Sequence, residues 1–264
     1  MELYQKPRNT VINQIIMQRT IVLFILICSF ATTHAQQVFL KQGKIEFERK
    51  TNTHRLYFSG ESDSWSEQFK KLIPQFKINY FDLVFTEDKS VYRPGREVEE
   101  QKSGFFENPA NDNIVYKDLK QQVSISQKQV FEGKFLLTDS IRHLEWKILP
   151  ETRTIAGFEC HKAVSKICDS VVVVAFYTDE IIASTGPESF SGLPGMILEL
   201  AIPRLYTTWT ATKLESLTPS DEKKLVPPTK GKKANEKEMT EKIKDGIKDW
   251  GDKYYHRAVW FAVL

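Results

Sequence analysis

Apolar and polar residues alternate along most of the chain beyond residue 36. Residues 45–48 read Ile-Glu-Phe-Glu, which places an apolar side chain at every second position. This period is typical of a strand with one buried face. Similar segments recur at short intervals, and the pattern predicts strands over residues 37–49, 81–86, 90–92, 114–119, 121–131, 134–139, 145–149, 155–164, 170–177, 196–202 and 207–214. Strands at this spacing favour an antiparallel meander.

Two segments change to a helical period. In residues 62–73 the apolar side chains fall three or four positions apart, and Pro74 ends the pattern. Residues 235–254 repeat this spacing, with Met239, Ile243, Ile247, Trp250 and Tyr254 on one face. We therefore predict a mainly β (α+β) fold: a strongly curved antiparallel sheet or half-barrel, with two amphipathic helices packed on or inside it.

The valine run at 171–174 is apolar on both alternating sets. Such a strand is expected to be covered on both faces. The predicted β domain spans residues 37–220. Residues 221–264 are predicted to form a basic connector and the C-terminal helix of the same domain.

The first 35 residues have the features of a secretory signal. Residues 21–30 (IVLFILICSF) are apolar, Arg19 precedes them, and Ala35 ends a stretch that suits cleavage. A start at Met17 would give a more typical signal. The apolar run is too short to span a bilayer, so no transmembrane span is predicted.

The charge of the mature chain gives no argument for nucleic acid. The whole chain has 37 basic and 34 acidic residues. Residues 1–35 hold three of the basic and one of the acidic residues, which leaves 34 minus 33, or +1. A nearly neutral chain lacks the basic surface that phosphate backbones require.

Two cysteines remain after the signal, Cys160 and Cys168. In an oxidising compartment they are expected to form a disulfide across a hairpin, provided that the strands bring their Cα atoms within about 7 Å. A buried thiol or a catalytic Cys160 is the alternative. Because side chains of neighbouring strand residues point to opposite faces, His161 could not activate Cys160. His54, His143 or His256 would have to do so.

Motifs for other chemistry are missing from the sequence. It has no His-Glu-x-x-His helix, no Cys-x-x-Cys pair, no acidic calcium loop, no phosphate-binding glycine loop and no Gly-x-Ser-x-Gly elbow. We expect no metal site and no cofactor.

Residues 191–200 read SGLPGMILEL, and Gly192, Leu193, Pro194 and Gly195 form their centre. Pro194 fixes its own φ, and Gly195 can adopt the positive φ that a type II turn needs after proline. We expect a structural turn that delivers residues 196–200 into the sheet. Nearby, Tyr177, Asp179, Glu180 and Phe190 are expected to line a binding mouth.

The segment YTDEIIASTGPESFSGLPGMILEL, residues 177–200, resembles the signature of the GLPGLI family of exported bacterial proteins. The resemblance extends to the block WKILPETRTIAGFECHKA, residues 146–163, although Met196 replaces the usual leucine after the motif. It implies a periplasmic or outer-membrane-associated protein of antiparallel β structure. The family has no established reaction, so no catalytic residue is transferred.

Together these features predict an exported envelope protein with a binding, carrier or interaction role, linked to an outer-membrane transport system. Its expected partner is a TonB-dependent receptor, another envelope protein or an apolar ligand. The rival hypothesis is an envelope enzyme that uses Cys160 or the cluster of Tyr177, Asp179 and Glu180.

Overall fold

The computed structural model describes residues 17–19, 39–60, 64–98, 110–130, 133–168, 170–247 and 252–264, without the side chains of residues 65, 253 and 254. The chain divides into two units, Met1–Val38 and Phe39–Leu264. In the first unit residues 17–19 are helical. The rest of the predicted signal peptide lies outside the described residues.

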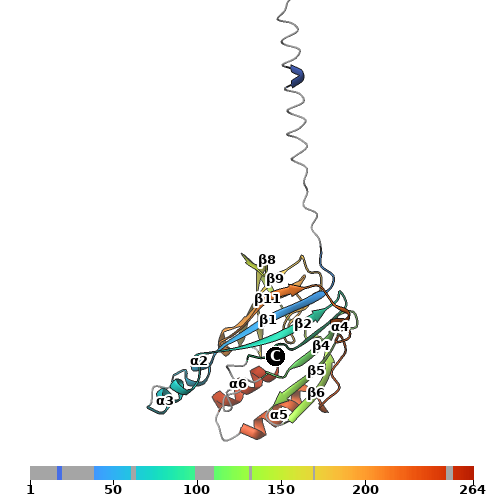
Figure 1. Cartoon of the computed structure of the whole chain (residues 1–264). Helices are drawn as coiled ribbons and strands as arrows, with labels where there is room; N and C mark the ends of the chain where they lie inside the picture. Colours follow the sequence, from blue (N-terminus) through green and yellow to red (C-terminus); the bar gives the residue numbers. More distant parts are fainter. Residues whose placement is uncertain are drawn as a thin grey trace, which may run out of the picture. The chain divides into compact units, whose positions relative to one another are not determined.

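The second unit is built on one open, curved sheet (Figure 1). Its order is β12-β6-β5-β4-β3-β2-β1-β11-β10-β9-β8-β7. Every neighbouring pair is antiparallel except β12 and β6, which are parallel. The strands are β1 (Gly43–Asn52), β2 (Phe76–Phe85), β3 (Lys89–Pro94), β4 (Ile114–Asp118), β5 (Val123–Val130), β6 (Gly133–Ser140), β7 (Lys147–Ile155), β8 (Phe158–Ile167), β9 (Val171–Thr178), β10 (Met196–Ile202), β11 (Thr207–Glu215) and β12 (Lys232–Ala234). The predicted fold class is confirmed.

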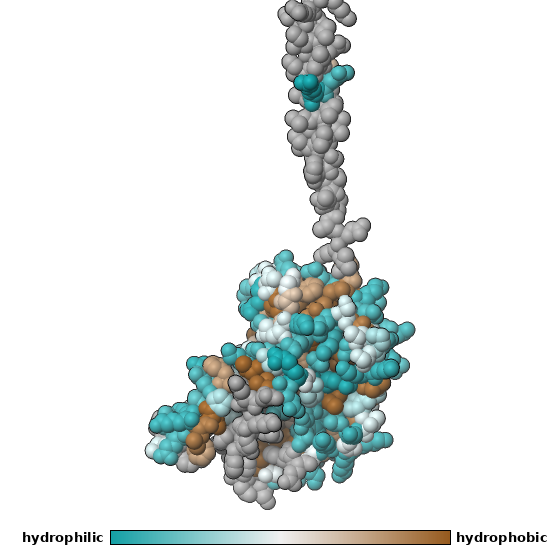
Figure 2. Space-filling model, viewed as in Figure 1, coloured by the Kyte–Doolittle hydropathy of each residue, from teal (hydrophilic) through white to brown (hydrophobic). Residues whose placement is uncertain are grey.

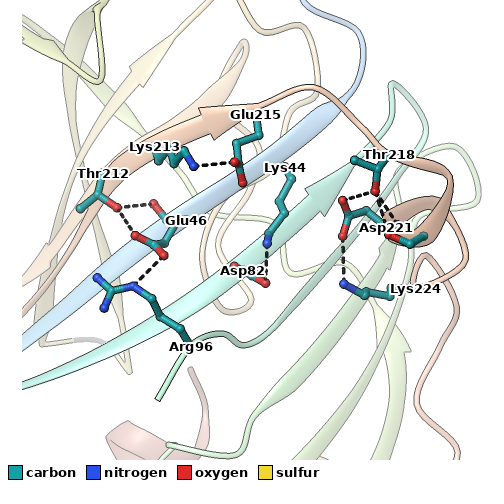
Figure 3. Close-up of polar contacts among 11 residues, drawn as sticks. Lys44, Glu46, Asp82, Arg96, Thr212, Lys213, Glu215, Thr218, Asp221 and Lys224 are labelled. Carbon is teal, nitrogen blue, oxygen red and sulfur yellow. Dashed lines mark hydrogen bonds and ion pairs between the residues drawn. The ribbon is translucent and has the colours of Figure 1, made fainter. Parts of the chain in front are cut away.

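The two faces of the sheet differ in polarity, as the alternation predicts. On the inner face, Phe47 of β1 is fully buried and lies opposite Phe81 of β2. On the outer face, Lys44 pairs with Asp82 at 3.0 Å and Glu46 accepts a hydrogen bond from Arg96, also at 3.0 Å (Figure 3). Exposed ion pairs contribute little stability each. They keep this face polar, in line with the hydrophilic residues that dominate the surface seen in Figure 2.

The helices lie at the ends and on the inner face of the sheet. They are α2 (Thr53–Phe58), α3 (Ser64–Leu72), α4 (Pro219–Glu222), α5 (Glu236–Ile247), α6 (Asp252–Ala262) and the 3-10 turn η2 (Pro203–Leu205). The helix predicted near 62–73 is confirmed as α3. The helix predicted near 235–254 is confirmed over α5, whereas its position 250 lies outside the described residues and Tyr254 belongs to α6; α2 and the rest of α6 were not predicted. Figure 1 shows α5 and α6 beside β4, β5 and β6, and their apolar residues pack against Phe135 and Leu137 of β6.

The segment between β9 and β10, residues 179–195, covers the rest of the inner face. Its side chains Ile181, Ala183, Phe190 and Leu193 are buried in the main apolar cluster, beside Phe47 and Trp209. This segment contains the Gly-Leu-Pro-Gly motif. Leu193 of the motif is therefore part of the core, whereas Gly192 and Pro194 are exposed.

The motif makes a tighter turn than the predicted type II turn. The Gly195 N–H donates a hydrogen bond to the Leu193 carbonyl at 2.7 Å, which closes a three-residue γ-turn centred on Pro194. Gly195 adopts φ +139°, and a Cβ at this position would lie 2.0 Å from the Thr178 carbonyl oxygen. Close approach to β9 is thus what requires glycine here.

The expectation that residues 171–174 are covered on both faces is wrong. Val171 and Val173 are fully buried, but Val172 is 41% exposed. At this end of β9 the side chains on the inner face are covered, whereas the outer face is open to solvent at Val172.

Gly195→Ala is expected to lower the free energy of unfolding by at least about 3 kcal/mol, since the backbone of β9 would have to move. Gly157→Ala is the matched control, because Gly157 also has positive φ (+89°) but no heavy atom within 4 Å of the added Cβ. Its expected cost is about 1–2 kcal/mol. Urea unfolding of both variants measures the difference, and equal losses would contradict the close-approach argument.

Candidate functional site

Seven charged side chains are buried in the described part of the chain: Arg49, Lys77, Lys117, Asp118, Lys128, Glu188 and Asp221. Four of them form one electrostatic group, because Arg49, Lys117 and Lys128 each interact with Glu188. Arg49 is fixed by its contacts: its guanidinium donates to the Ala110 carbonyl at 3.1 Å and to Asn79 at 3.2 Å, and it lies 4.8 Å from the centre of the Phe81 ring. It therefore has a structural role. The other three charges surround or adjoin a cavity.

Lys117 comes from β4 and holds the covering segment in place. Its Nζ donates to the carbonyl oxygens of Phe190 at 2.8 Å and Gly186 at 3.1 Å. Burial lowers the pKa of Lys117 to about 7, with Glu188 opposing this effect and Lys128 adding to it. In the protonated form, one N–H of Lys117 remains for a further acceptor.

Lys128 comes from β5 and differs from Lys117 in having no such acceptor. The residue is only 3% exposed, and its Nζ has no hydrogen-bonding partner among the described residues. Burial lowers the pKa of Lys128 to about 8; Arg142 acts in the same direction, and Glu188 and Glu236 oppose it. A buried amine without an acceptor is costly, which distinguishes this position from an ordinary core site.

Both lysines line a cavity of about 220 Å³. This volume equals that of roughly seven water molecules in the liquid. The strand register explains the floor of the cavity: Lys117 lies opposite Ser124, Ser124 opposite Asp139, and Ser126 opposite Leu137. The floor thus presents Lys117, Ser124, Ser126, Lys128, Leu137 and Asp139.

Helical and loop residues complete the cavity. Met239 of α5, Ala262 of α6 and Val263 supply apolar atoms. At the rim, Arg142 and Glu236 form an ion pair at 2.9 Å, and both are partly exposed. Ser189 also lines the cavity, and its Oγ has no hydrogen-bonding partner among the described residues.

Glu188 adjoins the cavity and links the buried charges. It adopts a left-handed conformation (φ +52°), and its Oε2 accepts a hydrogen bond from Asn113 at 3.0 Å. Its negative charge counteracts the effect of burial on the pKa of Lys117 and of Lys128. Burial also raises the pKa of Tyr92 well above its usual value, and Glu188 adds to this shift.

The donors in the cavity suit an anion. Two ammonium groups and several hydroxyl groups can each donate hydrogen bonds to a carboxylate, sulfate or phosphate oxygen. The described part of the chain contains no group of three or more His, Cys, Asp and Glu side chains placed to hold a metal ion. Within the same residues, no helix has the length and apolar character needed to cross a membrane.

The predicted binding mouth is not assembled as expected. Phe190 is fully buried in the core and cannot line an open mouth. Tyr177 is 5% exposed, with its ring 5.8 Å from that of His161. Burial raises the pKa of Tyr177, and the nearby charge of Asp179 adds to the shift. Asp179 is exposed, whereas Glu180 uses its carbonyl to accept a hydrogen bond from the Leu40 N–H at 2.8 Å.

The expected disulfide is absent: Cys160 is a buried free thiol and Cys168 is exposed. Both residues belong to one extended segment, because β8 continues to Ile167 and the turn to β9 follows at 168–170. The seven residue steps along the strand from Cys160 to Ile167 span about 23 Å, far more than a disulfide can bridge. The prediction failed because it placed the hairpin turn between the two cysteines.

The geometry does not support Cys160 as a nucleophile. Burial raises the pKa of its thiol to about 12, and its Sγ lies 3.5 Å from the Phe158 carbonyl oxygen. Two of the proposed activating histidines are engaged elsewhere: His54 contacts the Ile73 carbonyl, and His256 stacks on Trp260.

The fold and the site together define a class: an open, curved antiparallel sheet with a small basic cavity under its helices. Residues 164–199, which include the Gly-Leu-Pro-Gly motif, match the family described as "Protein of unknown function (Porph_ging)". The chain is thus similar over a short stretch to a family of unknown function, and the resemblance to the GLPGLI family by name stays a prediction. No curated protein matches the sequence.

The likeness to the solved structure of PNGF-II concerns the fold alone. The structure of PNGF-II in the P21 space group has a TM-score of 0.50 at 16% identity and covers 74% of this chain. This chain matches 32% of the PNGF-II chain, about a third of its length. An uncharacterized conserved protein from Thermus thermophilus has a TM-score of 0.36 at 5% identity, over 75% of this chain and 94% of that one.

The lowered pKa of Lys128 predicts a stability that depends on pH. Between about pH 8 and pH 10.5 the folded chain binds fewer protons here than the unfolded chain, so the free energy of unfolding rises with pH across this range. In Lys128→Met the free energy of unfolding is expected to increase less across this pH range, by on the order of 3 kcal/mol. Lys134→Met, at an exposed position of β6, is the control and should keep the wild-type slope. Urea unfolding at several pH values measures the slopes, and equal slopes in all three proteins would refute the assignment.

Cys160 is expected to resist alkylation in the folded protein. With its pKa near 12 and its side chain buried, its reaction with iodoacetamide at pH 8 should be at least about a hundredfold slower than in urea. Peptide mapping without reductant should find no Cys160–Cys168 link. Native-state labelling at the rate seen in urea would restore the thiol hypothesis.

Proposed function

We propose that this chain is an exported, non-enzymatic binding protein of the bacterial envelope whose cavity binds a small anionic ligand. One observation carries the proposal: Lys128 lines the cavity, and its Nζ is buried without an acceptor among the described residues. An anion supplies the missing acceptor and also offsets the cost of burying a charged ammonium group.

The other donors around the cavity support the same ligand chemistry. Ser189 Oγ has no described partner, and Lys117 retains one N–H beyond its two carbonyl contacts. A ligand with two or three oxygen atoms could therefore contact Lys128, Lys117 and Ser189. The volume of about 220 Å³ suits a small molecule.

An apolar ligand on the concave face is less well supported. This face is filled by its own side chains, since Phe47, Phe81 and Trp209 are each no more than 1% exposed. Residues 179–195 cover them. A lipid carrier needs an apolar cavity or groove, whereas the cavity beside β4, β5 and β6 contains ammonium and hydroxyl groups.

Export, the envelope location and a TonB-dependent receptor as partner belong to the proposal. They are supported by the signal-like residues 1–35 and by the resemblance to the GLPGLI family. N-terminal sequencing of protein from an envelope fraction tests the cleavage after Ala35.

Anion binding is tested by thermal unfolding with acetate, sulfate and phosphate at constant ionic strength, at pH 7. At least one anion should raise the Tm of the wild-type protein; at a hundred times its Kd it would stabilise the fold by about 2.7 kcal/mol. Lys128→Met should lose this response, and the exposed-site variant Lys134→Met should keep it. Binding should weaken as the pH rises above about 7, because Lys117 and then Lys128 lose their protons.

Two results would contradict the proposal. One is an equal rise in Tm for the wild-type protein and for Lys128→Met, which would indicate a general salt effect. The other is calorimetry that detects no heat of binding for any of the three anions at millimolar concentration.

A further inference from the structure

We propose that the lysine-rich connector between α4 and α5, residues 223–234, docks the protein on the surface of an anionic lipid bilayer. The inference goes beyond the proposed function, because no residue of this connector lines the cavity. The nearly neutral charge of the mature chain hides a local concentration of positive charge at this place.

The connector reads KKLVPPTKGKKA and contains five lysines and no acidic residue. One of them, Lys224, pairs with Asp221 at 2.9 Å (Figure 3). The others are exposed and form no ion pair with any residue that the structure describes: Lys223, Lys230, Lys232 and Lys233. Clusters of about four to eight cationic side chains bind anionic lipid headgroups, since each lysine near the surface adds to the attraction.

Contacts near both ends of the connector hold it against the sheet. Arg93 of β3 donates a hydrogen bond to the Lys224 carbonyl at 2.9 Å. At the other end β12 pairs with β6, with Lys232 opposite Phe135. Next to this pair, Gly231 has φ +126°, and a Cβ there would lie 2.9 Å from the carbonyl carbon of Phe135. The lysines therefore belong to a fixed surface at the edge of the sheet.

The composition of this surface favours a bilayer over a protein or a nucleic acid. Protein interfaces are enriched in arginine and aromatic residues and depleted in lysine, and single-stranded nucleic acids are bound by aromatic stacking. The connector has neither arginine nor aromatic residues. Val226, which is 55% exposed, lies between the lysines in sequence. It can enter the headgroup region while the long lysine side chains reach the lipid phosphates.

Lysines on an edge strand also have a simpler role, which is to prevent pairing with the strands of other chains. β12 is an edge strand, so this role applies to Lys232 and Lys233. It requires no lipid, and it does not involve Lys223 or Lys230, which lie outside β12. Substitution of the latter two residues therefore separates lipid binding from protection of the edge.

Sedimentation with lipid vesicles tests the inference. The protein used is residues 36–264, because the apolar residues 21–30 would bind lipid by themselves and the compact unit Phe39–Leu264 contains the whole sheet. It should bind vesicles of phosphatidylcholine with about 30% phosphatidylglycerol, but not pure phosphatidylcholine, and salt should weaken the binding. The double variant Lys223→Gln/Lys230→Gln should bind about 25-fold more weakly, or about fivefold for each lysine.

The matched control is Lys147→Gln/Lys166→Gln, which removes two exposed lysines from β7 and β8 and should leave vesicle binding nearly unchanged. Equal weakening in both double variants would refute the inference, because it would indicate an effect of net charge alone. Failure of the wild-type protein to sediment with anionic vesicles at low salt would refute it as well.

Val226→Ser distinguishes a bilayer from a soluble polyanion. The variant should bind anionic vesicles about fivefold more weakly, because serine gains little from entering the headgroup region. Its binding to inorganic polyphosphate should equal that of the wild-type protein. If Val226→Ser binds vesicles as tightly as the wild-type protein and both bind polyphosphate, the surface recognises soluble polyanions and docking on a bilayer is refuted.

Discussion

The packing of the inner face depends on the two hydrogen bonds that the Nζ of Lys117 donates. They join β4 to the segment between β9 and β10 through the carbonyl oxygens of Gly186 and Phe190. These carbonyls lie over the sheet, where water cannot satisfy them, so loss of the lysine would leave both unpaired. These contacts also fix the positions of Glu188 and Ser189 beside the cavity. The same two hydrogen bonds therefore hold the segment that covers the core and set the geometry of the site.

The cavity arises where two kinds of covering meet. Residues 179–195 cover the strands around β1 and β10, whereas α5 and α6 cover β5 and β6. Residues 179–195 belong to the main apolar cluster and α5 to the second, while α6 contributes Phe261 to the first and Ala262 to the second. The cavity lining combines residues of both regions, such as Ser189 and Met239. Polar side chains of β4 and β5 fill the boundary between them. An open sheet covered by two separate elements leaves such a boundary, which a single continuous layer would close.

Much of the fold follows from local patterns, but the site does not. Period-two alternation identifies the strands, since side chains such as Ile45 and Phe47 must all face one way to be buried. The same rule fails for Lys117 and Lys128, because it assigns lysines on alternating strands to the solvent face. Their burial depends on residues 186–190 and on α5 and α6, which are distant in sequence. The only local sign is that Lys117 shares its face with Val115, a fully buried residue. Prediction of the cysteine pair failed for a related reason, since an error of a few residues in a turn position separates two side chains by a whole strand.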